Sequence, residues 1–157
     1  ATSILWNNTA PTSSVFSIGT YDYVNFNNST YIAWCWHSVP GYSSIASYTG
    51  NGSTDGPFIY TGFAPQWIMV KVATSQINAT NWQVYDTTRN PNNVIPDYHF
   101  IDSYAVESNS ASTYFNADIL SNGFKIRGGN TYGMNQSGAK YIYMAFAENP
   151  FKNSNAR

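Results

Sequence analysis

The sequence has few charged residues: lysine, arginine, aspartate and glutamate make up 10% of its 157 residues, against about 25% in an ordinary soluble domain. Its 7 basic and 8 acidic side chains give a net charge of −1. A chain this close to neutral has no long-range field that would attract phosphate backbones. We therefore expect no nucleic acid among its partners.

Cysteine and long apolar runs are equally scarce. The single cysteine, Cys35, cannot form an intrachain disulfide. Its place in the apolar run Tyr31–Trp36 favours inert packing in a core over a reactive thiol. No window of about 20 apolar residues occurs, so we expect no transmembrane helix and no membrane partner. The chain starts at Ala1 without a signal peptide, which indicates processing or a piece of something longer.

Groups that could carry catalysis are also few. The only histidines are His37 and His99, and no spacing typical of a zinc site, a nucleophile elbow or a phosphate loop is present. Asp97 and Asp102 lie five residues apart, which places them on opposite sides of a strand. We therefore predict that the protein is not an enzyme and that it has no cofactor.

Small neutral polar residues and aromatic residues take the place of charge. Asn, Ser and Thr number 19, 18 and 14, about a third of the chain, and Tyr, Phe and Trp number 13, 9 and 5. Leucine occurs only twice, and no segment has helical periodicity over three turns. Apolar runs between Gly, Asn, Pro and Ser clusters instead predict strands, at residues 14–18, 30–37, 43–49, 57–60, 66–73, 81–86, 98–101, 113–119, 123–127 and 140–147.

These strands predict an all-β protein, an antiparallel β-sandwich. The runs Trp67–Val70 and Tyr141–Phe146 are apolar throughout, as is typical of central strands buried on both faces. We also expect in the core the four tryptophans that lie within predicted strands, Trp34, Trp36, Trp67 and Trp82.

An internal repeat organises the chain. Phe16–Ile18 and Tyr31–Trp36 correspond to Phe124–Ile126 and Tyr141–Phe146, at offsets of 108 and 110 residues. We interpret residues 1–39 as the closing strands of a truncated preceding repeat, which add extra strands, 41–151 as one complete β-sandwich repeat, and 152–157 as a C-terminal tail. Chance similarity between two strand-turn-strand pieces is the alternative.

Several long segments resemble a repeat domain of predicted tail-fibre and virion surface proteins of marine tailed bacteriophages. They are Trp6–Phe16, Gly41–Ser53, Tyr60–Lys71, Asn81–Asp86, Leu120–Ile126 and Tyr141–Phe151. The resemblance covers nearly the whole chain. It implies a lectin-like, concanavalin-type jelly-roll sandwich located on the outer, extracellular surface of a virion, and it brings no catalytic residues with it.

Lectin-like sandwiches often bind calcium through Asp, Asn and carbonyl oxygens, so calcium is an alternative to the absence of a cofactor. The candidate ligands are Asp55, Asp86, Asp97 and Asp102, whose spacing matches no loop signature. Asp86 followed by Arg89 is more simply interpreted as a salt bridge or a turn.

Glycan binding is the sharper hypothesis, because a sugar has an apolar ring face and a hydroxyl rim that suit an aromatic platform with Asn nearby. The candidate platform residues, expected in exposed loops, are Tyr48, Tyr60, Tyr98, Tyr104, Tyr114 and Tyr132, with Asn51, Asn92, Asn93 and Asn130 as polar partners. The alternative for any one of these tyrosines is a strand face or a subunit contact.

Two functions follow. The first is a non-enzymatic adhesin module, in a tail fibre or appendage, that binds host surface carbohydrate. The second is a structural capsid-decoration, fibre or filament protein whose partners are other subunits. For both we expect contacts with other virion proteins and self-association, as a trimer or polymer. The strands of residues 1–39 cannot close a sandwich alone, so we expect them to pair with the 41–151 domain or with a neighbouring subunit.

Overall fold

The computed structural model describes residues 3–74, 81–109, 116–128 and 133–150. The chain divides into two compact units, an N-terminal unit of residues 1–35 and a C-terminal unit of residues 36–157. The described part of the N-terminal unit contains two one-turn helices, α1 (Ser3–Trp6) and α2 (Asp22–Asn25). No helix in the described part of the chain has the length and apolar character needed to cross a membrane.

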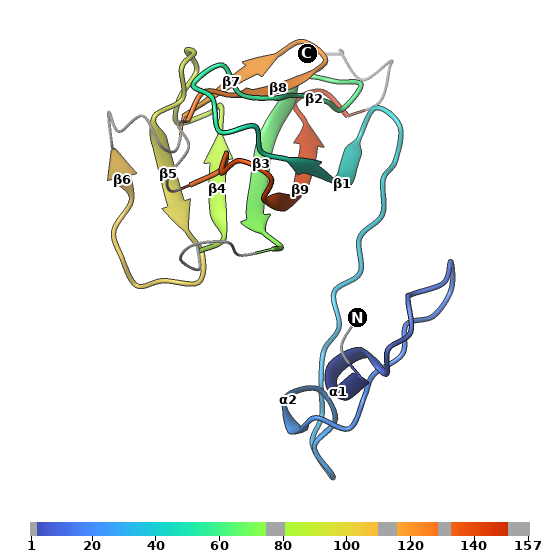
Figure 1. Ribbon diagram of the computed structural model, residues 1–157. Helices are drawn as coiled ribbons and strands as arrows, with labels where there is room; N and C mark the ends of the chain where they lie inside the picture. Colours follow the sequence, from blue (N-terminus) through green and yellow to red (C-terminus); the bar gives the residue numbers. More distant parts are fainter. Residues whose placement is uncertain (1–2, 75–80, 110–115, 129–132, 151–157) are drawn as a thin grey trace. The chain divides into compact units, whose positions relative to one another are not determined.

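The C-terminal unit is built from β-strands (Figure 1). In the described residues these are β1 (Ser43–Thr49), β2 (Phe58–Tyr60), β3 (Pro65–Val72), β4 (Gln83–Asp86), β5 (Asp97–Phe100), β6 (Ser108–Asn109), β7 (Ala117–Leu120), β8 (Gly123–Ile126) and β9 (Lys140–Ala147). All pairings between them are antiparallel. The prediction of a mostly β protein is therefore confirmed.

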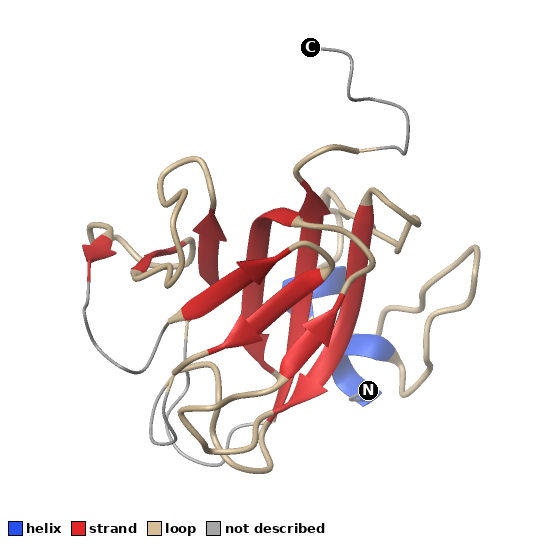
Figure 2. Ribbon diagram, turned by 90° about the horizontal axis from the view of Figure 1, so that it is seen from above, coloured by secondary structure: helices blue, strands red, loops and turns tan. Residues whose placement is uncertain are grey.

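The described strands form two sheets. The larger sheet has the order β1-β9-β3-β4-β5-β6 and the smaller one the order β2-β8-β7. Figure 2 shows the strands of the smaller sheet lying across one face of the larger one. This arrangement of two antiparallel layers is consistent with a β-sandwich.

The core lies between the two sheets. Because side chains alternate across a strand, Tyr141, Tyr143 and Ala145 of β9 are buried on the same side, and Phe124 and Ile126 of β8 are buried opposite them. The Phe124 ring meets the Tyr143 ring edge to face, with their centroids 5.3 Å apart. Aromatic side chains thus fill this core where leucine is scarce.

Strand prediction is most accurate in the larger sheet. The strands expected over 43–49 and 140–147 are confirmed residue for residue as β1 and β9. The other expected strands of the C-terminal unit match β2, β3, β4, β5, β7 and β8 with shifted ends, although residues 113–115 lie outside the described residues. Strand β6 was not expected, because Ser108–Ser112 is polar and indicates a loop.

The extra strands expected at 14–18 and 30–37 are absent, so this part of the fold prediction is wrong. In the described residues before β1 the structure has the two short helices and otherwise irregular chain. A strand needs a neighbour to accept its backbone hydrogen bonds and to cover its apolar face, and in the described residues these segments pair with no strand. The tail expected at 152–157 lies outside the described residues.

Without the strand expected at 30–37, the two tryptophans of that segment are exposed. Trp34 and Trp36 were expected in the core, but their exposed fractions are 74% and 53%. Cys35 between them is exposed too, rather than packed in an apolar interior. Trp67 and Trp82 are half-buried.

Candidate functional site

The outer face of the larger sheet, opposite the core, carries two aromatic side chains side by side. In β3, Ile68 and Val70 point into the core, so Trp67, which directly precedes Ile68, points outward. In the sheet register Trp67 lies opposite Phe146 of β9 on one side and opposite Asp86 of β4 on the other. Register therefore places an indole, a phenyl ring and a carboxylate in one row across three strands.

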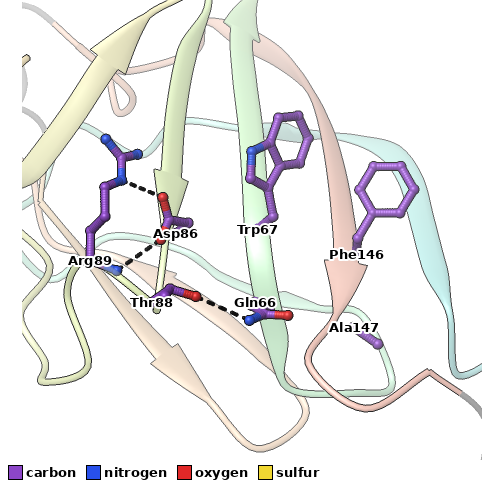
Figure 3. A pocket seen from close by; sticks show the side chains of 7 residues that line it. All are labelled: Gln66, Trp67, Asp86, Thr88, Arg89, Phe146 and Ala147. Atoms are coloured by element: carbon purple, nitrogen blue, oxygen red, sulfur yellow. Dashed lines mark hydrogen bonds and ion pairs between the residues drawn. The ribbon is translucent and has the colours of Figure 1, made fainter.

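This row opens into a pocket of about 470 Å³, which we call the Trp67 pocket (Figure 3). The described residues that line it are Gln66, Trp67, Asp86, Thr88, Arg89, Phe146 and Ala147. The Trp67 and Phe146 rings lie 5.6 Å apart between centroids and are tilted by 54°. Both side chains are half-buried, so they form an apolar wall that still reaches solvent.

A polar rim faces this aromatic wall (Figure 3). The chain turns directly after β4, where the backbone N–H of Arg89 donates a hydrogen bond of 2.9 Å to Asp86 Oδ1. The Arg89 guanidinium pairs with Asp86 Oδ2 through Nε and with Glu107 Oε1 through Nη1. The Asp86–Arg89 salt bridge and turn expected from the sequence are thus confirmed.

Gln66 and Thr88 complete the rim. Gln66 Nε2 donates a hydrogen bond of 3.1 Å to Thr88 Oγ1, and the backbone N–H of Thr87 donates to the Gln66 carbonyl at 2.9 Å. These bonds tie the start of β3 to the turn that follows β4. The amide and the hydroxyl are thereby held at the edge of the aromatic wall.

The carboxylate of the rim is ionised at neutral pH. Burial raises the pKa of Asp86, but the backbone N–H and the guanidinium of Arg89 lower it by more, so that it lies below its usual value of 3.8. Asp86 is therefore an acceptor of hydrogen bonds over the whole physiological range.

The chemistry available in the Trp67 pocket is recognition. An aromatic wall packs against an apolar surface, and a carboxylate, an amide and a hydroxyl bind polar groups at its margin. The described lining residues include no histidine, cysteine or serine. In the part of the chain that the structure describes, no three His, Cys, Asp or Glu side chains gather as a metal site would require.

Three of the four candidate calcium ligands are paired with cationic side chains. Asp55 lies 2.8 Å from Lys125 Nζ, Asp86 pairs with Arg89, and Asp102 lies 3.8 Å from Lys71 Nζ. The fourth, Asp97, has a buried Oδ1 without a hydrogen-bond partner. The structure thus places Asp55, Asp86 and Asp102 in three separate ion pairs.

Three of the candidate glycan-platform tyrosines, Tyr48, Tyr60 and Tyr98, lie in strands rather than in loops, so the expectation of exposed loops is wrong for them. Tyr48 and Tyr98 also point into the core. Tyr48 lies in β1, stacks on Tyr141 with centroids 5.0 Å apart, and donates a hydrogen bond from its hydroxyl to the Met134 carbonyl. Tyr98 lies in β5, is only 6% exposed, and packs against Tyr85. Both point inward because alternation along their strands directs them to the core.

Two candidate asparagines are exposed but serve the local structure. Asn93 binds the backbone of Ile119 at both its amide nitrogen and its oxygen, at 2.7 and 2.8 Å. Asn51 accepts from the backbone N–H of Ser53 and donates to the Asp55 carbonyl, which closes the loop after β1. Their side chains are occupied in holding loops.

Three other candidates are exposed to solvent: Tyr60 in β2, Asn92 between β4 and β5, and Tyr104 between β5 and β6. Tyr114, Asn130 and Tyr132 lie outside the described residues. None of these glycan-platform candidates is among the described residues that line the Trp67 pocket, although Asp86, a candidate calcium ligand of the sequence analysis, is.

The pocket residues were missed because Trp67 and Phe146 lie in the two runs that are apolar throughout. Such runs are typical of strands buried on both faces, whereas here the described strands of the smaller sheet cover only one face of β3 and β9. No sequence signal identifies the site, because what brings Trp67 beside Asp86 is the register between β3 and β4.

Comparison with known proteins gives one family. Residues 1–150 match the model of a domain of unknown function, DUF7483. No curated protein and no solved structure shows a significant match to the chain. The family match spans both units of the chain, and the protein therefore belongs to the DUF7483 family.

Proposed function

We propose that this chain is a non-enzymatic carbohydrate-binding module of a phage virion surface protein, an adhesin that attaches to host glycans. The observation that carries the proposal is the Trp67 pocket, in which a half-buried aromatic wall that reaches solvent faces an ionised carboxylate, an amide and a hydroxyl. The virion setting rests on the resemblance of the sequence segments to tail-fibre and surface proteins of marine tailed bacteriophages.

The size and lining of the pocket suit a sugar. About 470 Å³ lies within the usual range of small-ligand pockets, roughly 300–1,000 Å³. A sugar ring laid on Trp67 would bury its C–H face against the indole, while its hydroxyls would reach Asp86 and Gln66. The lectin-like jelly-roll connectivity is part of this proposal, and the two antiparallel sheets support it.

Paired variants of the full chain test where a glycan binds. We expect wild-type protein to bind one or more glycans on an array of bacterial surface glycans, and Trp67→Ala to weaken that binding at least about ten-fold through the lost stacking area. Tyr60→Ala is the matched control, since Tyr60 is an exposed tyrosine on the smaller sheet. Loss of glycan binding in Tyr60→Ala, with glycan binding retained in Trp67→Ala, would contradict the proposal. It would favour the tyrosine platform expected from the sequence.

A second candidate function is structural: a decoration, fibre or filament protein that binds other copies of itself. A specific observation favours it, the unusual apolar surface before β1. Each of the following large side chains is two-fifths or more exposed: Ile4, Trp6, Val15, Phe16, Ile18, Tyr21, Tyr23, Phe26, Tyr31, Ile32, Trp34 and Trp36. Apolar surface of this extent is typical of an interaction site rather than of an isolated monomer.

The repeat indicates how this surface could be covered. Tyr31–Trp36 matches the part of β9 that runs between β1 and β3. In that correspondence Cys35 takes the place of Ala145, which is fully buried. We propose that Tyr31–Trp36 pairs as a strand with a second copy of the chain, because an extended apolar segment gains backbone hydrogen bonds and a covered face by β-augmentation.

The single thiol tests this self-association. We expect the rate of maleimide labelling of Cys35 in the full chain to fall as the protein concentration is raised. Over the same range the mass measured by light scattering should rise. Ile32→Asp should restore fast labelling and lower the mass, whereas Trp67→Ala should behave as wild type. A monomer mass with rapid labelling at every concentration would contradict the structural function and leave the carbohydrate proposal standing.

A further inference from the structure

The charge of the Trp67 pocket is set by one guanidinium and two carboxylates. Arg89 is the only cationic residue among the described residues that line the pocket. Its Nε pairs with Asp86 and its Nη1 with Glu107, while its backbone N–H donates to Asp86 at 2.9 Å. The cation of the pocket therefore already has two anionic partners within the chain, and the three groups together carry a net negative charge.

Among the described residues that line this pocket, a bound anion would find no cation without an anionic partner. An arginine binds a carboxylate best when its planar guanidinium fork can face it. Here an incoming carboxylate would have to displace Glu107 or Asp86, or lie beside them at the cost of like-charge repulsion. A neutral sugar meets no such penalty, because its hydroxyls can donate to Asp86 and bind the side chains of Gln66 and Thr88.

We infer that the Trp67 pocket selects neutral sugars and discriminates against acidic ones, such as uronic acids, because Asp86 and Glu107 occupy Arg89. This inference rests on the proposed function and names the ligand class of the same site. Glu107 does not line the pocket in the described structure. It acts as a positioning residue through Arg89, whose Nη1 it occupies.

The test compares matched pairs of probes on the full chain. The methyl glycosides of glucose, galactose and mannose are each paired with the corresponding methyl glycosiduronic acid, which differs by a carboxylate at C6. Affinities are measured by saturation-transfer NMR titration at neutral pH and at two salt concentrations. We expect the wild-type protein to bind its best neutral glycoside roughly ten-fold or more tightly than the acidic counterpart.

Variants separate charge from packing. Glu107→Gln removes the carboxylate charge that pairs with Arg89 Nη1, so it should reduce the preference for neutral over acidic glycosides several-fold. Arg89→Gln should not increase the affinity for acidic glycosides, because no guanidinium remains. Asp22→Asn is the control, since it removes one negative charge in α2 of the N-terminal unit and should leave the preference unchanged.

The outcomes distinguish the two proposals. Equal or tighter binding of the acidic glycoside, with binding still lost in Trp67→Ala, would overturn the selectivity and keep the carbohydrate function. An unchanged preference in Glu107→Gln would overturn the role of Glu107. Failure of every neutral and acidic probe to bind would overturn both this inference and the proposed function.

Discussion

At the scale of single residues, tyrosine carries much of the burial in the C-terminal unit. Tyr85, Tyr141 and Tyr143 are buried, and their hydroxyls need partners because an unsatisfied buried polar group is costly. The Tyr141 hydroxyl donates to the Gly133 carbonyl at 3.0 Å and accepts from the backbone N–H of Gln136 at 2.9 Å. A core of tyrosines is thus also a set of hydrogen bonds that pins the loop before β9.

This core predicts sensitivity to alkali. Burial raises the pKa of Tyr48, Tyr85 and Tyr141 above the usual value of 10.0. A raised pKa in the folded state gives a contribution to stability that is complete below pH 10.0 and is lost as pH rises above it. We expect the melting temperature, followed by circular dichroism, to fall steeply above that pH. A melting temperature that stays constant well above pH 10.0 would contradict the burial of these hydroxyls.

The lowered pKa of Asp86 predicts that stability is lost in acid rather than in alkali. Its pKa is lowered, despite the raising effect of burial, by the Arg89 backbone N–H and guanidinium. Its contribution to stability is therefore present above pH 3.8 and is lost as pH falls below that value. Asp86→Asn should cost about 1 kcal/mol in the free energy of unfolding at neutral pH, measured by urea denaturation. The difference in the free energy of unfolding between Asp86→Asn and wild type should shrink towards zero below pH 3.8. An equal loss at neutral and at acid pH would contradict this account.

At the scale of elements, close approach of β2 and β8 depends on a glycine. Gly123 begins β8 directly after the turn that joins it to β7, and a Cβ built there would lie 2.1 Å from the carbonyl oxygen of Ile59 in β2. The Asn122-Gly123 pair favours a hairpin on turn chemistry alone. The structure adds a second reason for the glycine, which is the space taken by the neighbouring strand.

Gly123→Ala should therefore separate β2 from β8. We expect a loss of about 2–3 kcal/mol in the free energy of unfolding, since the contact is with backbone that cannot rotate away. Gly41→Ala is the comparison: no atom lies within 4 Å of its added Cβ, and only its positive φ of 73° opposes the change, at about 1 kcal/mol. Equal losses in the two variants, measured by urea denaturation, would contradict the close approach.

Strand positions were predictable where a strand pairs with a neighbour in the sheet. The aromatic and β-branched run of β9 lies between β1 and β3, so local preference and tertiary pairing agree. Tyr31–Trp36 has the same character but pairs with no strand in the described structure, and the same preference does not make it a strand. The strand propensity of a residue measures how well its side chain fits a sheet, and it does not supply the neighbouring strands that make the sheet.

At the scale of the whole molecule, the site could not be predicted because it depends on which sheet face is covered. Sequence pattern places Trp67 and Phe146 in apolar strands, but it does not say that the smaller sheet covers only the face with Ile68 and Tyr143. The loop tyrosines that composition favours are in part core residues, as Tyr98 is. Recognition surfaces built across three strands arise from register, which one sequence does not display.

The central claim is that the Trp67 pocket binds carbohydrate, and one NMR measurement tests it most directly. The indole N–H resonances of the five tryptophans can be followed while the full chain is titrated with the best-binding neutral methyl glycoside, with Trp67→Phe used to assign the Trp67 signal. We predict a saturable shift of the Trp67 indole resonance, with much smaller changes at Trp34 and Trp36. A saturable shift confined to other tryptophans, or a titration that moves none of them, would contradict the claim.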